Sequence, residues 1–212
     1  MVHSARMTAA VTPKGERRRY ALVSAAAELL REGGFEAVRH RAVASRAGLP
    51  LASTTYYFSS LDDLVESAVD YISAMEAAQL RAWVEELPRR RRGPEATVDV
   101  LVDLLVGGPT GERISEQLIS RYERFIACAR QPALREIQAR LLHQRVAAAE
   151  EALSRSGRRI RSEVVTSLVY AVDGAVVAGL VDHTDEPREL ARSMLIEFID
   201  VLAPIDERLI RA

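Results

Sequence analysis

Residues 38–64 read VRHRAVASRAGLPLASTTYYFSSLDDL, and this stretch decides the fold. It holds two short segments with helical spacing, at about 40–46 and 51–57, joined by a turn at 47–49 with Gly48 at its centre. Glycine suits the tight turn between two such helices because it reaches a left-handed backbone conformation without a steric cost. The stretch therefore predicts a helix-turn-helix unit, in which the second helix enters the major groove of DNA.

The second of these helices carries side chains suited to DNA. Its N-terminal residues face the base edges, where small or apolar side chains meet thymine methyl groups and hydroxyls form hydrogen bonds. Tyrosine hydroxyls and basic side chains reach the phosphates. The expected DNA-contacting residues are Arg39, His40, Arg41, Pro50, Leu51, Ala52, Thr54, Thr55, Tyr56 and Tyr57. Tyr57 suits the core of this small unit equally well, and Phe58 is expected in that core.

Helical spacing continues in both directions, and no alternating run is long enough for a sheet. Thr12-Pro13 begins a helix that ends at Gly33-Gly34, and Ser60 caps a long helix. Further helices are expected over 61–87, 95–106, 112–130, 132–155, 160–182 and 187–202. We therefore expect an all-α chain of about nine helices, with a three-helix head over 12–60 and a larger helical body over 61–212.

Composition and charge narrow the class of protein. The chain has 212 residues and a net charge of −1, but residues 1–60 carry nine Lys/Arg against four Glu, a local charge of +5. A basic head on an acidic body is typical of a protein that meets a polyanion at one end. The single Cys128 excludes an intrachain disulfide, and the four histidines show no metal-binding spacing, so we expect no metal and no cofactor.

We also expect a soluble, cytoplasmic chain that does not enter a membrane. Residues 1–13 contain no uninterrupted apolar core of the kind found in a secretory signal. The longest apolar run, 164–181, is interrupted by Asp173 and Gly174 and is expected to fall short of a comfortable membrane span.

Five short motifs follow one another within about 14–64. They are a Gly-aromatic pair, an alanine before the turn, an Ala-Gly-hydrophobic turn, a Tyr-Phe pair and a following leucine. In this chain they are Gly34-Phe35, Ala44, Ala47-Gly48-Leu49, Tyr57-Phe58 and Leu64. On these residues the stretch resembles the DNA-binding head of the TetR (tetracycline repressor) family of bacterial regulators. Three positions depart from the family pattern: Arg39 replaces a threonine, Ala52 a glycine, and Leu61 a lysine that grips phosphate.

The resemblance implies a homodimer that binds a palindromic double-stranded DNA operator, and we expect it to be a repressor. Family members dimerise through their last two long helices, which here are 160–182 and 187–202. Small residues line one face of the first, and larger apolar residues recur at steps of four in the second: Ala171, Gly174, Ala175 and Ala178, then Leu190, Met194, Phe198 and Leu202. The alternative for both helices is an internal core.

The resemblance also implies a cavity among the middle helices for a small organic effector that releases the protein from DNA. Aromatic side chains and a thiol among apolar positions suit an organic molecule. The candidate ligand-binding residues are Met75, Trp83, Tyr122, Phe125, Cys128, His143, Tyr170 and Asp173. Asp173 is the strongest candidate because a carboxylate in an apolar helix needs a partner, either the effector or an arginine across the dimer interface.

Two other functions stay open. A DNA-binding regulator without an effector, controlled by its abundance or by a protein partner, has the same head. An enzyme built in a helical bundle is disfavoured, because Asp173 and His183 are ten residues apart on one expected helix, too far for a hydrogen-bonded dyad. The glycine-rich stretch 107–111 also lacks the lysine of a phosphate-binding loop.

Overall fold

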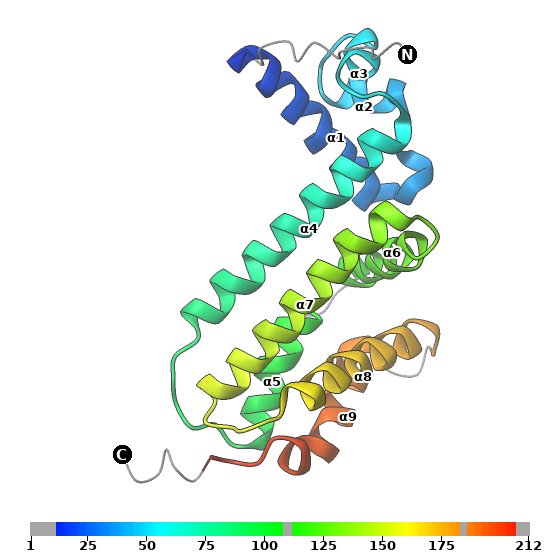
Figure 1. Ribbon diagram of the computed structural model, residues 1–212. Coiled ribbons are helices and arrows are strands. Elements are labelled where there is room, and N and C mark those ends of the chain that lie inside the picture. Colours follow the sequence, from blue (N-terminus) through cyan, green and yellow to red (C-terminus); the bar gives the residue numbers. More distant parts are fainter. Residues whose placement is uncertain (1–11, 108–111, 183–185, 207–212) are drawn as a thin grey trace, which may run out of the picture. The chain divides into compact units, whose positions relative to one another are not determined.

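The computed structural model describes residues 12–107, 112–182 and 186–206, so that His183 lies outside the described residues. Within these ranges the chain forms nine α-helices and no strand (Figure 1), which confirms the all-α prediction. The helices are α1 Pro13–Ala37, α2 His40–Arg46, α3 Ala52–Tyr57, α4 Leu61–Glu86, α5 Pro94–Leu105, α6 Glu112–Cys128, α7 Pro132–Arg155, α8 Ser162–Val181 and α9 Pro187–Leu202.

The chain divides into two compact units, residues 1–72 and 73–212. The α4 helix belongs to both units, because it runs without a break from Leu61 to Glu86. The predicted functional division into 12–60 and 61–212 assigns all of α4 to the body, and it stays a prediction.

In the first unit α1 packs against α2, and α2 packs against α3. The α1 helix begins as expected, since the Thr12 hydroxyl accepts a hydrogen bond from the backbone N–H of Gly15 at 3.2 Å. Its regular dihedral angles end at Gly33 and Gly34, where the backbone kinks before a last turn. The buried apolar side chains of this core include Leu22, Ala26, Leu30, Val38, Val43, Ala44, Phe58 and Leu64.

An ion-pair fork holds α2 against α1. Arg46, in the last turn of α2, donates to the two carboxylate oxygens of Glu32 at 2.7 and 2.9 Å and to Glu28 at 3.3 Å. These hydrogen bonds lower the pKa of Glu32 and raise the pKa of Arg46. The paired contacts connect the last turn of α2 to α1, because a forked guanidinium matches the two oxygens of a carboxylate.

The turn from α2 into α3 depends on Gly48. Its φ angle of 64° is left-handed, and its backbone N–H donates to the Ser45 carbonyl at 3.1 Å. The next N–H, that of Leu49, donates to the Ala44 carbonyl at 2.9 Å. These bonds satisfy carbonyl groups at the end of α2 and direct the chain into α3.

Reciprocal side-chain bonds begin α4. The Ser60 hydroxyl accepts a hydrogen bond from the backbone N–H of Asp63 at 3.1 Å, as the predicted cap requires. The Asp63 carboxylate in turn accepts from the backbone N–H of Ser59 at 2.9 Å. Two N–H groups that have no partner within the helix are thereby satisfied.

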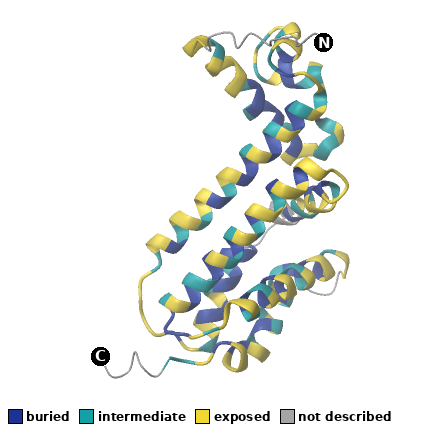
Figure 2. Cartoon of the chain, viewed as in Figure 1, coloured by how far each residue is buried: buried dark blue, intermediate teal, exposed yellow. Residues whose placement is uncertain are grey.

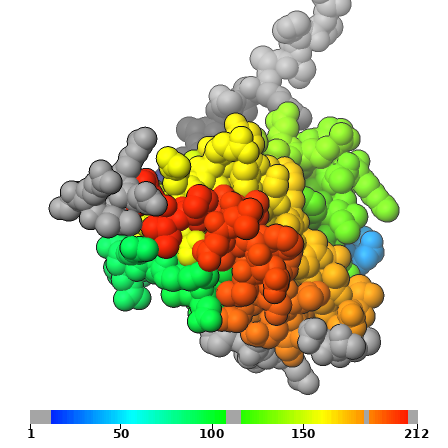
Figure 3. Space-filling view, turned by 90° about the horizontal axis from the view of Figure 1, so that it is seen from below, coloured from blue at the N-terminus to red at the C-terminus, as the bar shows by residue number. Residues whose placement is uncertain are grey.

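In the second unit α8 packs against α9, and α5 packs against both α7 and α9. Figure 2 shows buried residues along the sides on which these helices meet. Figure 3 shows α9 on the surface of this unit, bordered by α8 on one side and by α5 on another. One fully buried large side chain from each helix lies in the shared core: Leu101, Leu153, Leu168 and Ile199.

By length and composition alone, α8 is able to cross a membrane, with a mean hydropathy of 2.0 over its apolar window. This corrects the expectation that its apolar run falls short. In the structure α8 contacts α6, α7 and α9, and Val165, Leu168 and Val169 are buried in the core of the unit. This packing is typical of a core helix that is apolar nearly all round.

We expect Gly48→Ala to lower the free energy of unfolding by about 1 kcal/mol, because a residue with a Cβ is strained in the left-handed region. A Cβ at Gly48 meets nothing within 4 Å, so the loss reports backbone strain alone. Gly93→Ala is the matched control, because Gly93 has equally open space and a φ of −66°. Guanidinium denaturation followed by circular dichroism measures both variants, and equal stabilities would contradict the role given to Gly48.

Candidate functional sites

The first candidate site is the exposed face of α3 and the turn before it. Leu51 and Tyr56 expose 50% and 76% of their surface, and Ala52 and Thr55 are exposed with them. Pro50, which precedes this helix, is exposed as well. These residues belong to the N-terminal part of the second helix of a helix-turn-helix unit, where side chains contact base edges.

Thr54 does not belong to this face. It is fully buried, and its hydroxyl donates to the Leu51 carbonyl at 2.8 Å. Phe58, one turn further on, is 2% exposed and lies in the core as predicted. Thr54 and Phe58 therefore hold α3 against the rest of the first unit, and the Thr54 side chain is not available to DNA in this conformation.

The other predicted contacts flank the exposed face. Arg39 and Arg41 are exposed, and Arg39 forms an ion pair with Glu36 in place of the missing hydroxyl cap of α2. His40 is half-buried, and its Nδ1 has no hydrogen-bond partner among the described residues. Tyr57 is half-buried, with its ring edge-on to that of Tyr56 at 4.9 Å.

The second candidate site is a cavity of about 210 Å³ in the second unit. It has room for one small organic molecule. Four helices and the residues just after α5 supply its lining: Glu76, Gln79, Leu80, Trp83, Asp103, Leu104, Leu105, Gly107, Arg121, Tyr122, Arg124, Phe125, Gln138, Leu141 and Arg145.

One wall of the cavity is a buried polar network around Asp173 of α8. Arg145 of α7 donates to the two Asp173 carboxylate oxygens at 2.7 and 2.8 Å, and the Tyr122 hydroxyl of α6 donates to one of them at 2.8 Å. Burial raises the pKa of Tyr122, and the charge of Asp173 raises it further. Burial alone lowers the pKa of Arg145, but the hydrogen bonds and charge of Asp173 outweigh it and raise that pKa.

Two more carboxylates at the cavity have arginine partners. Glu76 accepts a hydrogen bond from Arg124 at 2.6 Å, and Asp103 is paired with Arg188 of α9. A third cavity arginine, Arg121, donates to the backbone carbonyl of Leu105 at 3.1 Å. The lining therefore combines apolar side chains with several arginines, and all its named residues come from the second unit.

The structure brings three of the predicted ligand-binding residues to the cavity: Trp83, Tyr122 and Phe125. Asp173 stands behind the lining, and both of its oxygens are held by side chains of the same chain. The other four predicted residues do not line the cavity. Met75, His143 and Tyr170 are exposed, and Cys128 is buried elsewhere, where burial raises the pKa of its thiol.

The charged lining of the cavity was not predicted from the sequence. Arg121 and Arg124 share the inner side of α6 with Cys128, at spacings of three and four residues. That spacing was an available signal, because arginines on the same stripe as a buried residue face the interior. The sequence left the effector or an arginine across the dimer interface as the partner of Asp173, whereas Arg145 of the same chain fills that role.

Among the described residues, no group of three or more His, Cys, Asp or Glu is arranged to hold a metal ion. The fold and the two sites define a class of protein, a helix-turn-helix regulator with an internal cavity in a second helical unit. Residues 92–201 match the family described as tetracyclin repressor-like, C-terminal domain, and residues 22–68 match the bacterial regulatory proteins of the tetR family. The chain belongs to the TetR family of transcriptional regulators.

Individual relatives agree with this assignment. The chain is 32% identical over 97 residues to the HTH-type transcriptional dual regulator CecR of Shigella flexneri, a match that covers 46% of this chain and 43% of that protein. It thus spans less than half the length of the curated relative that it matches.

Three solved structures are also similar. The multidrug binding protein EbrR complexed with imidazole is 28% identical with a TM-score of 0.63, over 85% of this chain and 93% of that chain. EbrR complexed with proflavin is also 28% identical, with a TM-score of 0.65 over 86% and 99% of the two chains. SCO1917, a member of the TetR family from Streptomyces coelicolor A3, is 28% identical with a TM-score of 0.57, over 85% and 96%.

We expect Asp173→Asn to lower the free energy of unfolding by about 3 kcal/mol, because it leaves the buried Arg145 without a counter-charge. Asp99→Asn removes one partner of the exposed Asp99–Arg192 pair and should change stability little. Chemical denaturation of both variants measures the difference. Equal small effects would mean that solvent already screens the Asp173–Arg145 pair.

Proposed function

We propose that this chain is a cytoplasmic repressor that binds a palindromic DNA operator as a homodimer and leaves it when a small organic effector binds. The proposed DNA binding rests on the exposed face of α3. Leu51, Thr55 and Tyr56 are free to contact bases, while Thr54 and Phe58 anchor the opposite side in the core. A helix held in this way presents its contact residues as a rigid unit, as sequence-specific recognition requires.

Phosphate contacts are assigned to the basic residues beside this face. Arg39 and Arg41 lie at the start of α2, and both are exposed. The net charge of +5 over residues 1–60 attracts the DNA backbone and supplies the salt-dependent part of the affinity. Leu61 stands where the family pattern has a lysine, so one phosphate contact of that pattern is absent from the proposed interface.

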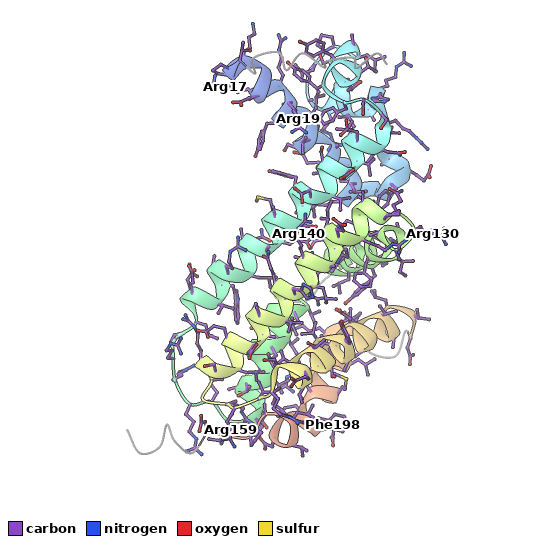
Figure 4. All side chains as sticks on the ribbon, in the orientation of Figure 1. Arg17, Arg19, Arg130, Arg140, Arg159 and Phe198 are labelled. Carbon is purple, nitrogen blue, oxygen red and sulfur yellow. The ribbon has the colours of Figure 1, made fainter. Side chains whose placement is uncertain are left out.

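The homodimer is supported by an uncovered apolar face on α8 and α9. Only 33% of the apolar window of α8 is buried within the chain. The exposed large apolar residues of the two helices are Tyr170, Val177, Val181, Phe198, Val201 and Leu202, of which Figure 4 labels Phe198. Exposed apolar side chains on two helices that pack against each other favour an interaction site there.

The small residues predicted on α8 fit the same interface. Ala171, Gly174 and Ala178 are exposed, and a Cβ built at Gly174 meets nothing within 4 Å. A second copy of the chain therefore has room to bring a helix close to this face. Two such helices from each copy would form a four-helix interface, in which a residue and its symmetry mate contact the same surface.

The effector is assigned to the cavity of the second unit. The cavity is concave, and its lining combines apolar side chains with a few polar groups, which is the composition of small-molecule sites. The similarity to EbrR, whose structures hold imidazole and proflavin, supports a ligand-binding role for this unit.

We assign the coupling between effector and DNA to α4. Leu64 and Ala68 of this helix are buried in the first unit, while Leu80 and Trp83 line the cavity. An effector that binds best to one position of the second half of α4 therefore changes the preferred position of its first half. A difference of about 1.4 kcal/mol between the two states is enough to change the DNA affinity tenfold.

Two DNA contacts should respond differently to truncation. Tyr56→Ala is expected to lower the affinity for a duplex enriched from a random pool by about tenfold, with little effect on unrelated DNA. Arg41→Ala should weaken binding to all sequences and reduce the salt slope by about one, since it removes a phosphate contact. Fluorescence anisotropy at several salt concentrations measures both.

Arg31→Ala provides the control for Arg41→Ala, because it removes the same charge from an exposed position of α1 outside the proposed interface. It should leave the salt slope unchanged. If Tyr56→Ala and Arg41→Ala both bind the enriched duplex like the wild type, the assigned recognition surface is wrong.

Phe198→Glu should convert the dimer into a monomer, because it places a charge in the proposed interface while the Phe198 side chain is 54% exposed in the single chain. Ile126→Glu, at a residue of α6 that is 61% exposed, should leave the dimer intact. Sedimentation velocity at micromolar concentration distinguishes the two states. A dimer that persists in Phe198→Glu would place the interface elsewhere.

A further inference from the structure

The charges around the cavity do not balance. Three carboxylates stand at or behind its lining, and each has its own arginine: Glu76 has Arg124, Asp173 has Arg145, and Asp103 has Arg188. Arg121 also lines the cavity, and among the described residues it has no carboxylate within salt-bridge distance. One positive charge is therefore left over.

Arg121 is only partly satisfied by the protein. Its guanidinium has five N–H donors. Among the described residues, it donates a hydrogen bond to the Leu105 carbonyl at 3.1 Å. Burial lowers the pKa of Arg121, and the nearby Glu76 carboxylate offsets this only in part. A half-buried cation without a paired carboxylate is costly, and an anion that enters the cavity lowers that cost.

Two further polar atoms of the lining lack partners. The Arg124 Nε and the Gln138 Oε1 are buried, and no hydrogen-bond partner is present for either among the described residues. Arg124 is 4% exposed, so water does not readily satisfy its Nε–H. A carboxylate in the cavity would supply an acceptor for the buried Arg124 Nε–H, whereas the Gln138 oxygen is itself an acceptor and needs a donor.

The rest of the lining is apolar. Leu80, Trp83, Leu104 and Phe125 offer aliphatic and aromatic surface beside these arginines. The cavity of about 210 Å³ admits only a small molecule, and the single unpaired charge matches one negative charge. The site thus has a cationic end and an apolar end.

We propose that the effector of this chain is a small organic carboxylate, whose anionic group binds Arg121 and whose apolar body packs against Trp83 and Leu104. This inference rests on the proposed effector role of the cavity and adds the chemical class of the ligand. A guanidinium is suited to the task because its parallel N–H groups match the two oxygens of a carboxylate.

Of the two carboxylates that line the cavity, Asp103 is paired with Arg188 of α9, so a cationic effector would have to bind Glu76. Glu76 is paired with Arg124 at 2.6 Å. A cation that takes Glu76 leaves Arg124 buried without a counter-charge, next to the unpaired Arg121. Two arginines without a carboxylate partner would then face the ligand, and this arrangement is less favourable than a carboxylate beside Arg121.

The test uses three probes of the same shape and different charge: benzoate, benzamide and benzamidinium. Each is added to the full chain at millimolar concentration, and both the unfolding temperature and the calorimetric affinity are measured. At about ten times its Kd, benzoate should raise the unfolding temperature by about 3 °C, while the other two leave it unchanged. A preference for benzamidinium, equal shifts or no shift at all would overturn the proposal.

Two variants connect the effect to Arg121. Arg121→Gln should weaken benzoate binding by at least about tenfold, because a charge-assisted contact is lost. Arg130→Gln, at an exposed residue just beyond the same helix (Figure 4), should bind benzoate like the wild type. If Arg121→Gln does not unfold cooperatively, Arg121→Lys replaces it and should bind benzoate several-fold more weakly. Unchanged benzoate binding in the folded Arg121 variant would overturn the assignment.

The DNA assay separates this inference from the proposed function. If the protein selects an operator but shows no preference for benzoate, the proposed DNA-binding function stands and the carboxylate effector is wrong. If the protein binds benzoate through Arg121 but selects no operator, the ligand assignment stands and the proposed regulation of DNA binding is wrong.

Discussion

The α4 helix constrains the whole molecule, because one continuous helix supplies apolar residues to two separate cores. Ala68 is fully buried in the first unit, and Val84 is 5% exposed in the second. The helix has 26 residues, or about 39 Å at 1.5 Å per residue, and it contains neither proline nor glycine. Sharp kinks arise mainly at such residues, so α4 is suited to carry a change at the cavity to the DNA-binding unit.

The second constraint is that charges removed from water need partners. The Arg145–Asp173 pair with the Tyr122 hydroxyl meets this requirement inside one chain, and it fixes α6, α7 and α8 around the cavity. Arg121 does not meet it within the described residues, and the proposed effector is the group that would. The need to pair buried charges thus explains both the Arg145–Asp173–Tyr122 network and the proposed preference of Arg121 for an anion.

Most of the fold could be predicted from the sequence, because glycine, proline and capping residues mark where helices begin and end. The Thr12 and Ser60 caps and the turn at Gly48 are local effects that depend on a few neighbouring residues. Burial is not local. Thr54 suits a DNA contact by residue type, yet it lies on the inner side of α3 with Phe58. That Arg121 has no carboxylate partner can be recognised only when the partner of each nearby carboxylate is known.

The most direct test of the account is the selection of bound fragments from sheared genomic DNA of the source organism by the purified full chain, at near-physiological salt. The account predicts recovery of a shared inverted repeat, with half-sites about one helical turn apart, because two copies of α3 related by two-fold symmetry read it. Recovery of unselected DNA, or of none, would contradict a sequence-reading homodimer.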